Sequence, residues 1–251
     1  MKVALVTGGA IRIGAAIVMR LAEAGYAIAV HSHTSTDEAH GLCSTLIEAG
    51  VKAVAVTGNL EEPSVPCSLF AAANAVLGPV SLLVNNAAVF EHDELASFDA
   101  AQFDRIMAIN LRAPLLLVQA FAAQAPKDGS ASIVNLIDQR VLKPTPEYLS
   151  YALSKAGLWS ATRMLAQDLA PLIRVNAVGP GPTLPNTTDG KAGMKREVAN
   201  IPLLRAVSPR EIADAVAYLA EARSVTGQMI AVDGGQHIGW RTPDVVAIEK
   251  T

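Results

Sequence analysis

The chain has 251 residues, of which 51% are hydrophobic and 17% are charged. This length fits one large α/β domain, and the composition excludes an intrinsically disordered chain. Twenty Lys and Arg against 23 Asp and Glu give a formal net charge of −3, so we expect no nucleic-acid partner. No apolar run reaches the roughly 20 residues of a membrane span, so we expect no membrane partner. Two cysteines, Cys43 and Cys67, argue against a disulfide scaffold and favour a cytoplasmic location.

Short, continuously apolar segments alternate along the chain with longer segments of helical periodicity. The expected strands are residues 2–6, 27–31, 52–57, 81–84, 131–136, 174–178 and 229–232. The expected helices are residues 13–24, 36–49, 64–77, 100–124, 148–170 and 209–220. Strands without polar alternation suit a parallel sheet that is covered on both faces. We therefore predict an α/β fold, a single domain over residues 1–251 with a doubly wound (Rossmann) parallel sheet of about seven strands and helices on both faces.

Glycine and proline residues mark several of these boundaries. Gly25, Gly50 and Gly78 fall where helix C-caps belong, because glycine tolerates the left-handed conformation there. The stretch 179–193 is rich in Gly and Pro and follows the sixth strand. We expect it to be a loop over the carboxyl edge of the sheet, where ligands of open α/β sheets bind.

A glycine-rich turn, Thr-Gly-Gly-Ala-Ile-Arg-Ile-Gly at residues 7–14, joins the first strand to the first helix. Gly8 permits a tight turn, and Gly14 permits close packing of the helix. Free N–H groups and the dipole at a helix start favour the negative charge of a diphosphate. The turn therefore predicts a dinucleotide site, and the alternative is a plain strand-to-helix turn.

The end of the second strand favours NADP over NAD. A free ribose 2′-hydroxyl usually meets an Asp or Glu about 20 residues after the glycines, and residues 31–35 contain neither. The donors that stand there instead are His31, His33, Thr34, Ser35 and, from the glycine turn, Arg12. Such donors suit a 2′-phosphate. A metal pair of His31 and His33 has no apparent third ligand, so we expect no metal.

With further motifs, these residues make the chain resemble the short-chain dehydrogenase/reductase family from end to end. The further motifs are Asn85-Asn86-Ala87-Ala88, Asn110, Tyr151-Ala-Leu-Ser-Lys155, residues 174–182 and Val232-Asp-Gly-Gly235. Within this family the chain is most similar to pteridine reductases. That similarity rests on Arg12 in place of a common Gly, on the His-x-His pattern, on Asp138 in place of a common Ser, and on Phe90, which matches an aromatic that stacks on the pterin ring. The departures from the subgroup are Thr34 for Arg, Ala88 for Ser and Asn59 for Asp.

The resemblance implies a set of site residues. The implied NADP contacts are Gly8, Arg12, Ile13, Gly14, His33, Thr34, Ser35, Asn59, Leu60, Asn86, Ala87, Tyr151, Lys155 and Thr183. The implied catalytic residues are Asp138, Tyr151, Lys155 and Asn110, and the implied substrate contacts are Phe90, Asp138 and Tyr151. Without the resemblance, Tyr151 and Lys155 would be interpreted as a surface pair on a helix, Asp138 as a turn cap and Phe90 as a core or rim aromatic.

The types of these residues suggest how the chemistry would work. Tyr151 and Lys155 are four residues apart and so share one helix face, where the ammonium and a positive nicotinamide ring would lower the pKa of the phenol. By resemblance, Lys155 also binds ribose, and Asn110 holds a water that links Lys155 to solvent. An ionised Asp138 would repel the charge that develops on a carbonyl oxygen. A protonated Asp138, coupled to Tyr151, can instead protonate the ring nitrogen of a C=N bond.

These inferences favour an NADPH-dependent reductase that acts on a C=N bond of a pterin-like heterocycle, with a small molecule as its partner. One alternative is a carbonyl or 3-oxoacyl-type reductase, and another is a non-catalytic NADP(H)-binding sensor or scaffold. We expect His92, Asp93 and Glu94 to line the mouth of the site, and Arg140 and residues 182–206 to complete it.

The fourth and fifth expected helices are apolar on more than one face. The apolar residues are Phe103, Ile106, Met107, Leu111, Leu115, Leu116, Leu153, Leu158, Trp159, Met164 and Leu165. In the family these helices form a subunit interface, so we expect a homodimer or homotetramer; the alternative is a thick core. The tail, residues 236–251 with His237 and Trp240, is a candidate to reach a neighbouring subunit.

Overall fold

The computed structural model describes residues 2–186 and 190–240, and it confirms the doubly wound sheet. The strands are β1 (Lys2–Val6), β2 (Tyr26–Ser32), β3 (Ala53–Thr57), β4 (Leu82–Asn85), β5 (Ala131–Leu136), β6 (Ile173–Pro180) and β7 (Met229–Val232). All neighbouring strands are parallel, in the order β3-β2-β1-β4-β5-β6-β7. The chain reverses its winding direction between β1 and β4, and ligands of such sheets bind at that point.

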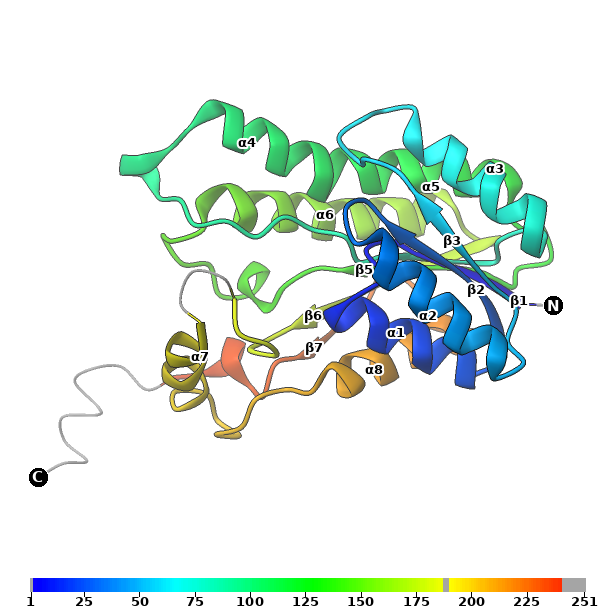
Figure 1. Cartoon of the computed structure of the whole chain (residues 1–251). Coiled ribbons are helices and arrows are strands. Elements are labelled where there is room, and N and C mark those ends of the chain that lie inside the picture. Colours follow the sequence, from blue (N-terminus) through cyan, green and yellow to red (C-terminus); the bar gives the residue numbers. More distant parts are fainter. Residues whose placement is uncertain (1, 187–189, 241–251) are drawn as a thin grey trace, which may run out of the picture.

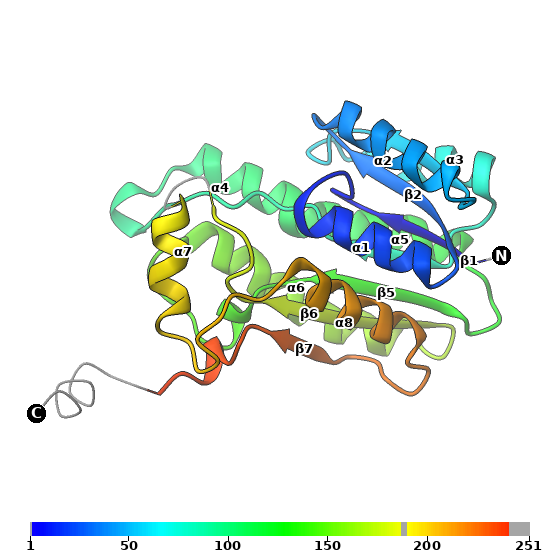
Figure 2. The same ribbon diagram turned by 60° about the horizontal axis from the view of Figure 1, so that its bottom comes forward.

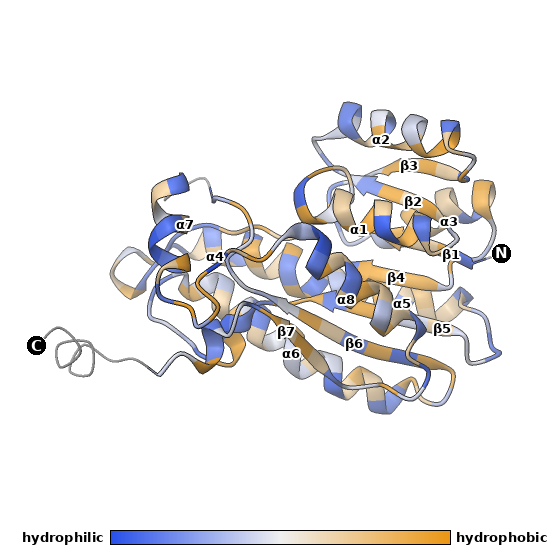
Figure 3. Ribbon diagram, turned by 90° about the horizontal axis from the view of Figure 1, so that it is seen from below, coloured by the Kyte–Doolittle hydropathy of each residue, from blue (hydrophilic) through white to orange (hydrophobic). Residues whose placement is uncertain are grey.

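Two layers of helices cover the two faces of the sheet (Figure 1). One layer consists of α1 (Arg12–Glu23), α2 (Thr36–Glu48) and α8 (Pro209–Glu221). The other consists of α3 (Val65–Leu77), α5 (Ala113–Gln124) and α6 (Leu149–Asp168). The strands are hydrophobic along most of their length (Figure 3) because both of their faces are buried.

The expected boundaries are close to the observed ones. Gly25 and Gly50 follow the ends of α1 and α2 with φ angles of 84° and 82°, as their predicted capping role requires. The stretch 179–193 departs from the expected loop, because β6 continues to Pro180 and α7 (Gly190–Val198) begins at Gly190. The helix α7 escapes prediction because it is short and mostly polar, so its sequence shows no apolar stripe.

The expected fourth helix is not one continuous α-helix. It consists of α4 (Ala100–Met107), a π-helical turn η2 (Ala108–Arg112) and α5. The π-helical turn contains Asn110, which is fully buried. Turns of this kind inside helices are frequent at functional sites.

One helical stretch in the described part of the chain, Ala100–Gln124, is long and apolar enough to cross a membrane by length and composition alone. The sequence predicts a helix over these residues, but the expectation that no apolar stretch reaches the length of a membrane span is wrong for it. Its α5 part packs on the sheet through Leu117, Val118 and Phe121, each at most 3% exposed. These contacts account for its apolar character as that of a core helix.

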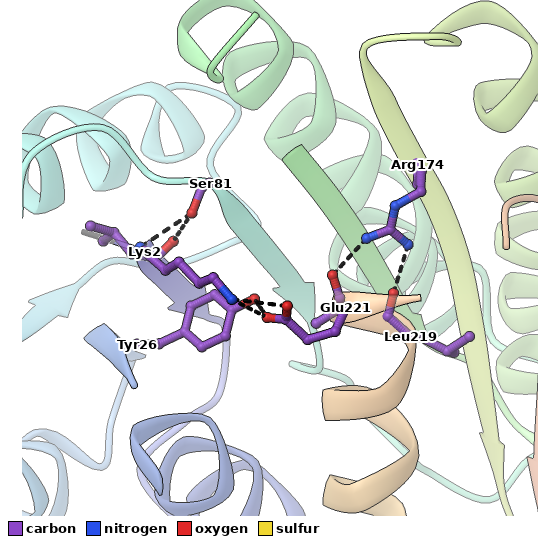
Figure 4. A network of polar contacts seen from close by, with 8 residues as sticks. Lys2, Tyr26, Ser81, Arg174, Leu219 and Glu221 are labelled. Atoms are coloured by element: carbon purple, nitrogen blue, oxygen red, sulfur yellow. Dashed lines mark hydrogen bonds and ion pairs between the residues drawn. The ribbon is translucent and has the colours of Figure 1, made fainter. Parts of the chain in front are cut away.

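A polar network connects the C-terminal end of α8 to the amino ends of the strands (Figure 4). The Nζ of Lys2 donates to both carboxylate oxygens of Glu221 at 2.8 and 2.9 Å, and the Tyr26 hydroxyl donates to Oε1 at 2.6 Å. The guanidinium of Arg174, on β6, donates to the carbonyls of Leu219, Ala220, Ala222 and Val225. The first three of these carbonyls lie at the C-terminus of α8, where helical hydrogen-bond partners run out, so a cation is favourable there, and Val225 follows the helix.

Arg174→Met removes these hydrogen bonds and leaves several carbonyls without a donor. We expect the free energy of unfolding to fall by about 1.5–3 kcal/mol, as for other hydrogen bonds to charged groups. Urea denaturation measures this change. Lys2→Met, which breaks an exposed ion pair, is the control and should cost less than about 1 kcal/mol. Equal losses in the two variants would contradict the capping role of Arg174.

Candidate active site

A groove of about 500 Å³ lies at the carboxyl ends of β1 and β2. The predicted cofactor residues that line it are Gly8, Arg12, Ile13, Gly14, His33, Thr34, Ser35, Asn59, Leu60, Asn86 and Ala87. Among the described residues, none that lines this groove is an Asp or a Glu. The structure therefore brings together the residues that the glycine turn and the end of the second strand indicated.

The glycine turn is packed too closely to admit side chains at Gly8 and Gly14. Gly8 has a φ angle of 58°, in the left-handed region that favours glycine. A Cβ atom on Gly14 would lie 2.0 Å from the carbonyl oxygen of Gly8, so no other residue fits there without moving the turn. Arg12 also has a positive φ angle, 55°, and its Nη2 donates to the carbonyl of Pro185 at 3.1 Å. A strained arginine thus connects the turn to the segment that follows β6.

His31 holds the glycine turn and offers no donor to a phosphate, which corrects the expectation that both imidazoles serve that purpose. Its ring is 2% exposed. The N–H of Gly8 donates to Nδ1 at 3.2 Å, and Nε2 lies 3.0 Å from the carbonyl of Gly58, to which it donates. Burial lowers the pKa of His31, in agreement with this neutral form. His33, which is exposed, remains available at the groove.

Asn86 connects the end of β4 to the glycine turn. Its Nδ2 donates to the carbonyls of Thr7 at 2.8 Å and Gly8 at 2.9 Å. The Thr7 hydroxyl accepts hydrogen bonds from the backbone N–H groups of Asn86 and Ala87. The Asn59 side chain accepts from the N–H of Glu61 at 3.0 Å and so stabilises the turn after β3.

A second cavity, of about 240 Å³, continues from this groove, with which it shares Arg12, Ile13, Asn86, Ala88 and Phe90. We call it the reaction cavity. The other predicted site residues that line it are Asp138, Tyr151, Lys155 and Thr183. Arg140 and parts of the segment 182–206, including Glu197, also line it, as the sequence analysis expected. The Thr183 hydroxyl donates to the carbonyl of Gly181 at 2.9 Å.

The hydroxyl of Tyr151 donates to Oδ2 of Asp138 at 3.0 Å. Asp138 follows β5 and Tyr151 lies in the first turn of α6, so the two elements present their side chains to each other. The backbone N–H of Arg140 donates to Oδ1 of Asp138 at 2.8 Å and fixes the carboxyl group. Burial raises the pKa of both groups, and the charge of Asp138 raises that of Tyr151 further. The site therefore disfavours the charged form of each group relative to that group in water.

Lys155 does not activate Tyr151 in the way the sequence analysis expected. Its Nζ donates to the carbonyl of Leu136 at 2.8 Å and lies 5.7 Å from the centre of the Tyr151 ring. Burial lowers the pKa of Lys155 to about 8, whereas the pKa of Tyr151 is raised. The expectation that the ammonium lowers the pKa of the phenol is wrong for the protein without a cofactor, because desolvation and the neighbouring carboxyl raise that pKa and outweigh the opposite effect of Arg140.

Asn110 uses its side chain to join the strand β4 region to α6. Its Oδ1 accepts from the N–H of Val89 at 2.8 Å, and its Nδ2 donates to the carbonyl of Val89 at 2.9 Å and to the Ser154 hydroxyl at 3.1 Å. Both N–H donors of the amide are thereby used. The water that the family resemblance implies at Asn110 stays a prediction.

Phe90 faces two tyrosine rings. It stacks on Tyr148 with ring centres 4.3 Å apart and an interplanar angle of 9°, and it meets Tyr151 edge-on at 4.6 Å. One face of Phe90 is thus covered by Tyr148, a residue that the sequence analysis did not identify. Tyr148 is 3% exposed and has a φ angle of 58° directly before α6. Its place three residues before Tyr151 was the only available signal.

Asp93 is not at the mouth of the site, which corrects another expectation. It is 1% exposed, and its carboxylate accepts hydrogen bonds from the N–H of Ser150, at 3.1 Å, and from the Ser150 hydroxyl. A carboxylate in this position satisfies free N–H groups at the start of α6. Asp93 therefore positions the helix that carries Tyr151 and Lys155. His237 and Trp240 are described, but most of the predicted tail, residues 241–251, lies outside the described residues.

Comparisons with known proteins agree with this geometry. A family model described as enoyl-(acyl carrier protein) reductase matches residues 9–237. A short-chain type dehydrogenase/reductase of Picea abies is 31% identical over 249 residues, which cover 94% of this chain and 92% of that protein. The chain belongs to the short-chain dehydrogenase/reductase family. Members of this oxidoreductase family that resemble it include 3-oxoacyl-acyl-carrier-protein reductase FabG of Staphylococcus aureus, 31% identical over 94% of this chain and 98% of that protein.

Solved structures of the family show the same fold at higher identity. FolM alternative dihydrofolate reductase 1 from Brucella canis, in complex with NADP, is 45% identical with a TM-score of 0.93, and the match covers 97% of each chain. A blue fluorescent protein from a metagenomic library, in complex with NADPH, is 37% identical with a TM-score of 0.88 over 94% of this chain and 97% of that chain.

The neutral His31 makes stability depend on pH. The pKa of its imidazole is lowered in the folded state, so below about pH 6.5, the ordinary value, the unfolded chain binds more protons than the folded one. We expect the contribution of His31 to stability to be lost as pH falls from this value through the lowered pKa. His31→Gln, whose amide can accept and donate at the same places, should show a smaller loss of urea stability between pH 7 and pH 5.

His40→Gln is the matched control because His40 is exposed on α2. It should keep the pH dependence of the wild type. A wild-type slope in the His31→Gln variant would contradict the role assigned to His31.

Proposed function

We propose that the chain is an NADPH-dependent reductase that transfers hydride to a C=N bond of a pterin-like heterocycle. The observation that carries this proposal is the hydrogen bond between Tyr151 and Asp138 in the reaction cavity, with the pKa of both groups raised. Reduction of a C=N bond requires a proton on nitrogen, and two neutral acids side by side can supply it.

The groove at the ends of β1 and β2 fits NADPH. The groove passes Gly8 and Gly14 at the start of α1, where free N–H groups would hold a diphosphate, and Arg12, His33, Thr34 and Ser35 would hold a 2′-phosphate without repulsion from a carboxylate. Solved relatives at 45% and 37% identity contain NADP or NADPH. When bound, NADPH supplies the hydride, which adds to the carbon of the C=N bond as the nicotinamide is oxidised.

The protein residues then complete the reduction at nitrogen. The neutral hydroxyl of Tyr151 donates its proton to the ring nitrogen, and a protonated Asp138 returns a proton to the phenolate oxygen 3.0 Å away. Arg140 holds the carboxyl group through its backbone N–H, and the ammonium of Lys155 favours the transient negative charge on Tyr151. Proton transfer along this pair avoids an isolated tyrosinate in a desolvated site.

The second candidate is a carbonyl or 3-oxoacyl-type reductase, which the FabG relatives favour. The reaction cavity supports this candidate less well. Asp138 stands where the family commonly has a Ser, and that Ser hydroxyl is the group that would donate a hydrogen bond to a carbonyl oxygen. A non-catalytic NADP(H)-binding sensor or scaffold has less support still, because Tyr151, Lys155 and Asp138 all line one cavity. An assay that monitors the absorbance of NADPH with a dihydropterin, with dihydrofolate and with a panel of ketones separates the three candidates. A pterin reductase oxidises NADPH with the first two compounds, a carbonyl reductase oxidises it with ketones, and a sensor or scaffold oxidises it with none.

We also propose a homodimer or homotetramer. Apolar side chains of α5 and α6 are exposed in the single chain, among them Leu115 at 38%, Leu153 at 49% and Met164 at 67%. This exposure argues against the alternative of a thick core. Leu153→Glu should shift the mass measured by light scattering towards that of a monomer, since it places a charge among these apolar side chains. An unchanged mass would place any interface elsewhere.

Because both cysteines are free thiols, we propose a cytoplasmic location.

Asp138→Asn keeps the shape of the side chain but cannot carry a proton for transfer. We expect kcat with a dihydropterin to fall about 100-fold or more, the usual contribution of general acid catalysis, while the Kd for NADPH is retained. The wild-type rate should also fall as pH rises through the raised pKa of the pair, because the donor form is then lost. Steady-state rates across pH and fluorescence titration of NADPH measure these effects. Asp168→Asn, on the exposed surface of α6, is the control, and unchanged turnover in Asp138→Asn would refute the donor role.

A further inference from the structure

Two loops from different strands line the groove at the carboxyl ends of β1 and β2. The turn after β3 contributes Asn59 and Leu60, and the loop after β4 contributes residues 86–90. In the sheet order β3-β2-β1-β4, the two loops lie on opposite sides of the glycine turn, which follows β1. A dinucleotide whose diphosphate lies at the glycine turn would therefore have one half beside each loop.

The two ends of the groove differ in their chemistry, and this difference sets the direction of the cofactor. The donors for a 2′-phosphate, His33, Thr34 and Ser35, follow β2, which pairs with β3. The reaction cavity, with Asp138 and Tyr151, lies on the side of β4 and β5. The adenosine half of NADPH, which carries the 2′-phosphate, would therefore lie beside the turn after β3.

Arg112 holds the turn after β3 from outside the groove. It is the last residue of the π-helical turn η2, and its Nη2 donates to the carbonyl of Glu61 at 2.5 Å. Glu61 directly follows Asn59 and Leu60, and its N–H donates to the Asn59 side chain. Arg112 does not line the groove, so it can affect a ligand there only through this turn.

The turn after β3 has few other anchors. Within the described part of the chain, the hydrogen bond from Arg112 is the one that reaches residues 59–62 from another element. The side chain of Leu60 packs into the core, which fixes the position of that residue. The contact with Arg112 fixes the peptide group that follows Leu60 and Glu61, and with it the orientation of the turn towards the groove.

The same helical stretch also holds the loop on the other side of the groove. The elements α4, η2 and α5 follow one another in one long helical stretch on one face of the sheet (Figure 2). Asn110 binds both the N–H and the carbonyl of Val89, and Arg105 pairs with Glu91. Residues two apart on a helix point to different sides, so Asn110 reaches the loop after β4 while Arg112 reaches the turn after β3.

From these contacts we infer that Arg112 is a positioning residue for the adenosine half of NADPH. It acts through the carbonyl of Glu61 and contributes to cofactor affinity without contacting the cofactor. The inference rests on the NADPH site of the proposed function, and it is independent of the substrate that is reduced.

The test measures binding of NADPH by fluorescence titration and of adenosine 2′,5′-bisphosphate by competition with NADPH. The second probe contains the adenosine half of the cofactor and lacks the nicotinamide. In Arg112→Met, both Kd values should rise by the same factor, about 3- to 10-fold, the effect of losing one hydrogen bond from a charged donor near the surface. Arg112→Lys, which keeps a donor for the carbonyl of Glu61, should retain most of the affinity.

Arg20→Met is the matched control. It removes the ion pair between Arg20 on α1 and Asp214 on α8, and neither residue lines the groove, so both Kd values should stay at those of the wild type. Unchanged Kd values in Arg112→Met, or an equal rise in Arg20→Met, would overturn the inference. A larger loss for NADPH than for the bisphosphate would also overturn it, because a general loosening of the site weakens both halves of the cofactor.

These measurements need no pterin, so the two proposals can fail separately. If the wild type binds NADPH but reduces neither a dihydropterin nor dihydrofolate, the proposed function fails, and a selective loss of the adenosine probe in Arg112→Met still supports the role of Arg112. If both compounds are reduced and Arg112→Met binds both probes as the wild type does, the role of Arg112 is wrong and the proposed function stands.

Discussion

The hydrogen bond between Tyr151 and Asp138 is the constraint that gives the candidate active site its character. Away from bulk solvent, neither group ionises readily, and the charge of one would penalise the charge of the other. Two weak acids whose charged forms are both disfavoured thus lie together beside the groove for the dinucleotide. The other features of the site maintain this arrangement.

Several contacts outside the Tyr151–Asp138 pair hold these two side chains in place. The buried carboxylate of Asp93 secures the start of α6, and Asn110, on a π-helical turn, joins that helix to the residues after β4. Tyr148 enters α6 in a left-handed conformation, and its ring covers Phe90. The N–H of Arg140 fixes the carboxyl of Asp138. Loops are generally more mobile than the strands and helices that they connect. These contacts restrict the motion of the loops after β4 and β5 and of the start of α6, which carry the site residues.

Local patterns in the sequence were sufficient for the sheet and for most of the groove. Continuous apolar strands, glycines at helix ends and the turn at residues 7–14 each have one dominant physical cause, so the expected elements and the residues that line the groove agree with the structure. The Tyr151–Asp138 pair was predictable only through family resemblance, because its members are 13 residues apart on different elements. The partners of His31, Asp93 and Lys155 were not predictable, because they depend on distant backbone atoms. The helix α7 was not predicted, because its sequence has no apolar stripe.

Burial lowers the pKa of Lys155 to about 8, even though its Nζ donates to the carbonyl of Leu136, a contact that favours the charged form. The ammonium of Lys155 therefore deprotonates under mildly alkaline conditions, well before Tyr151, whose pKa is raised. Without a ligand, the pocket thus becomes less positive while its phenol is still intact. An alkaline solution therefore neutralises Lys155 before it ionises the phenol, and any oxidation run in reverse at high pH would begin from an uncharged amine at Lys155.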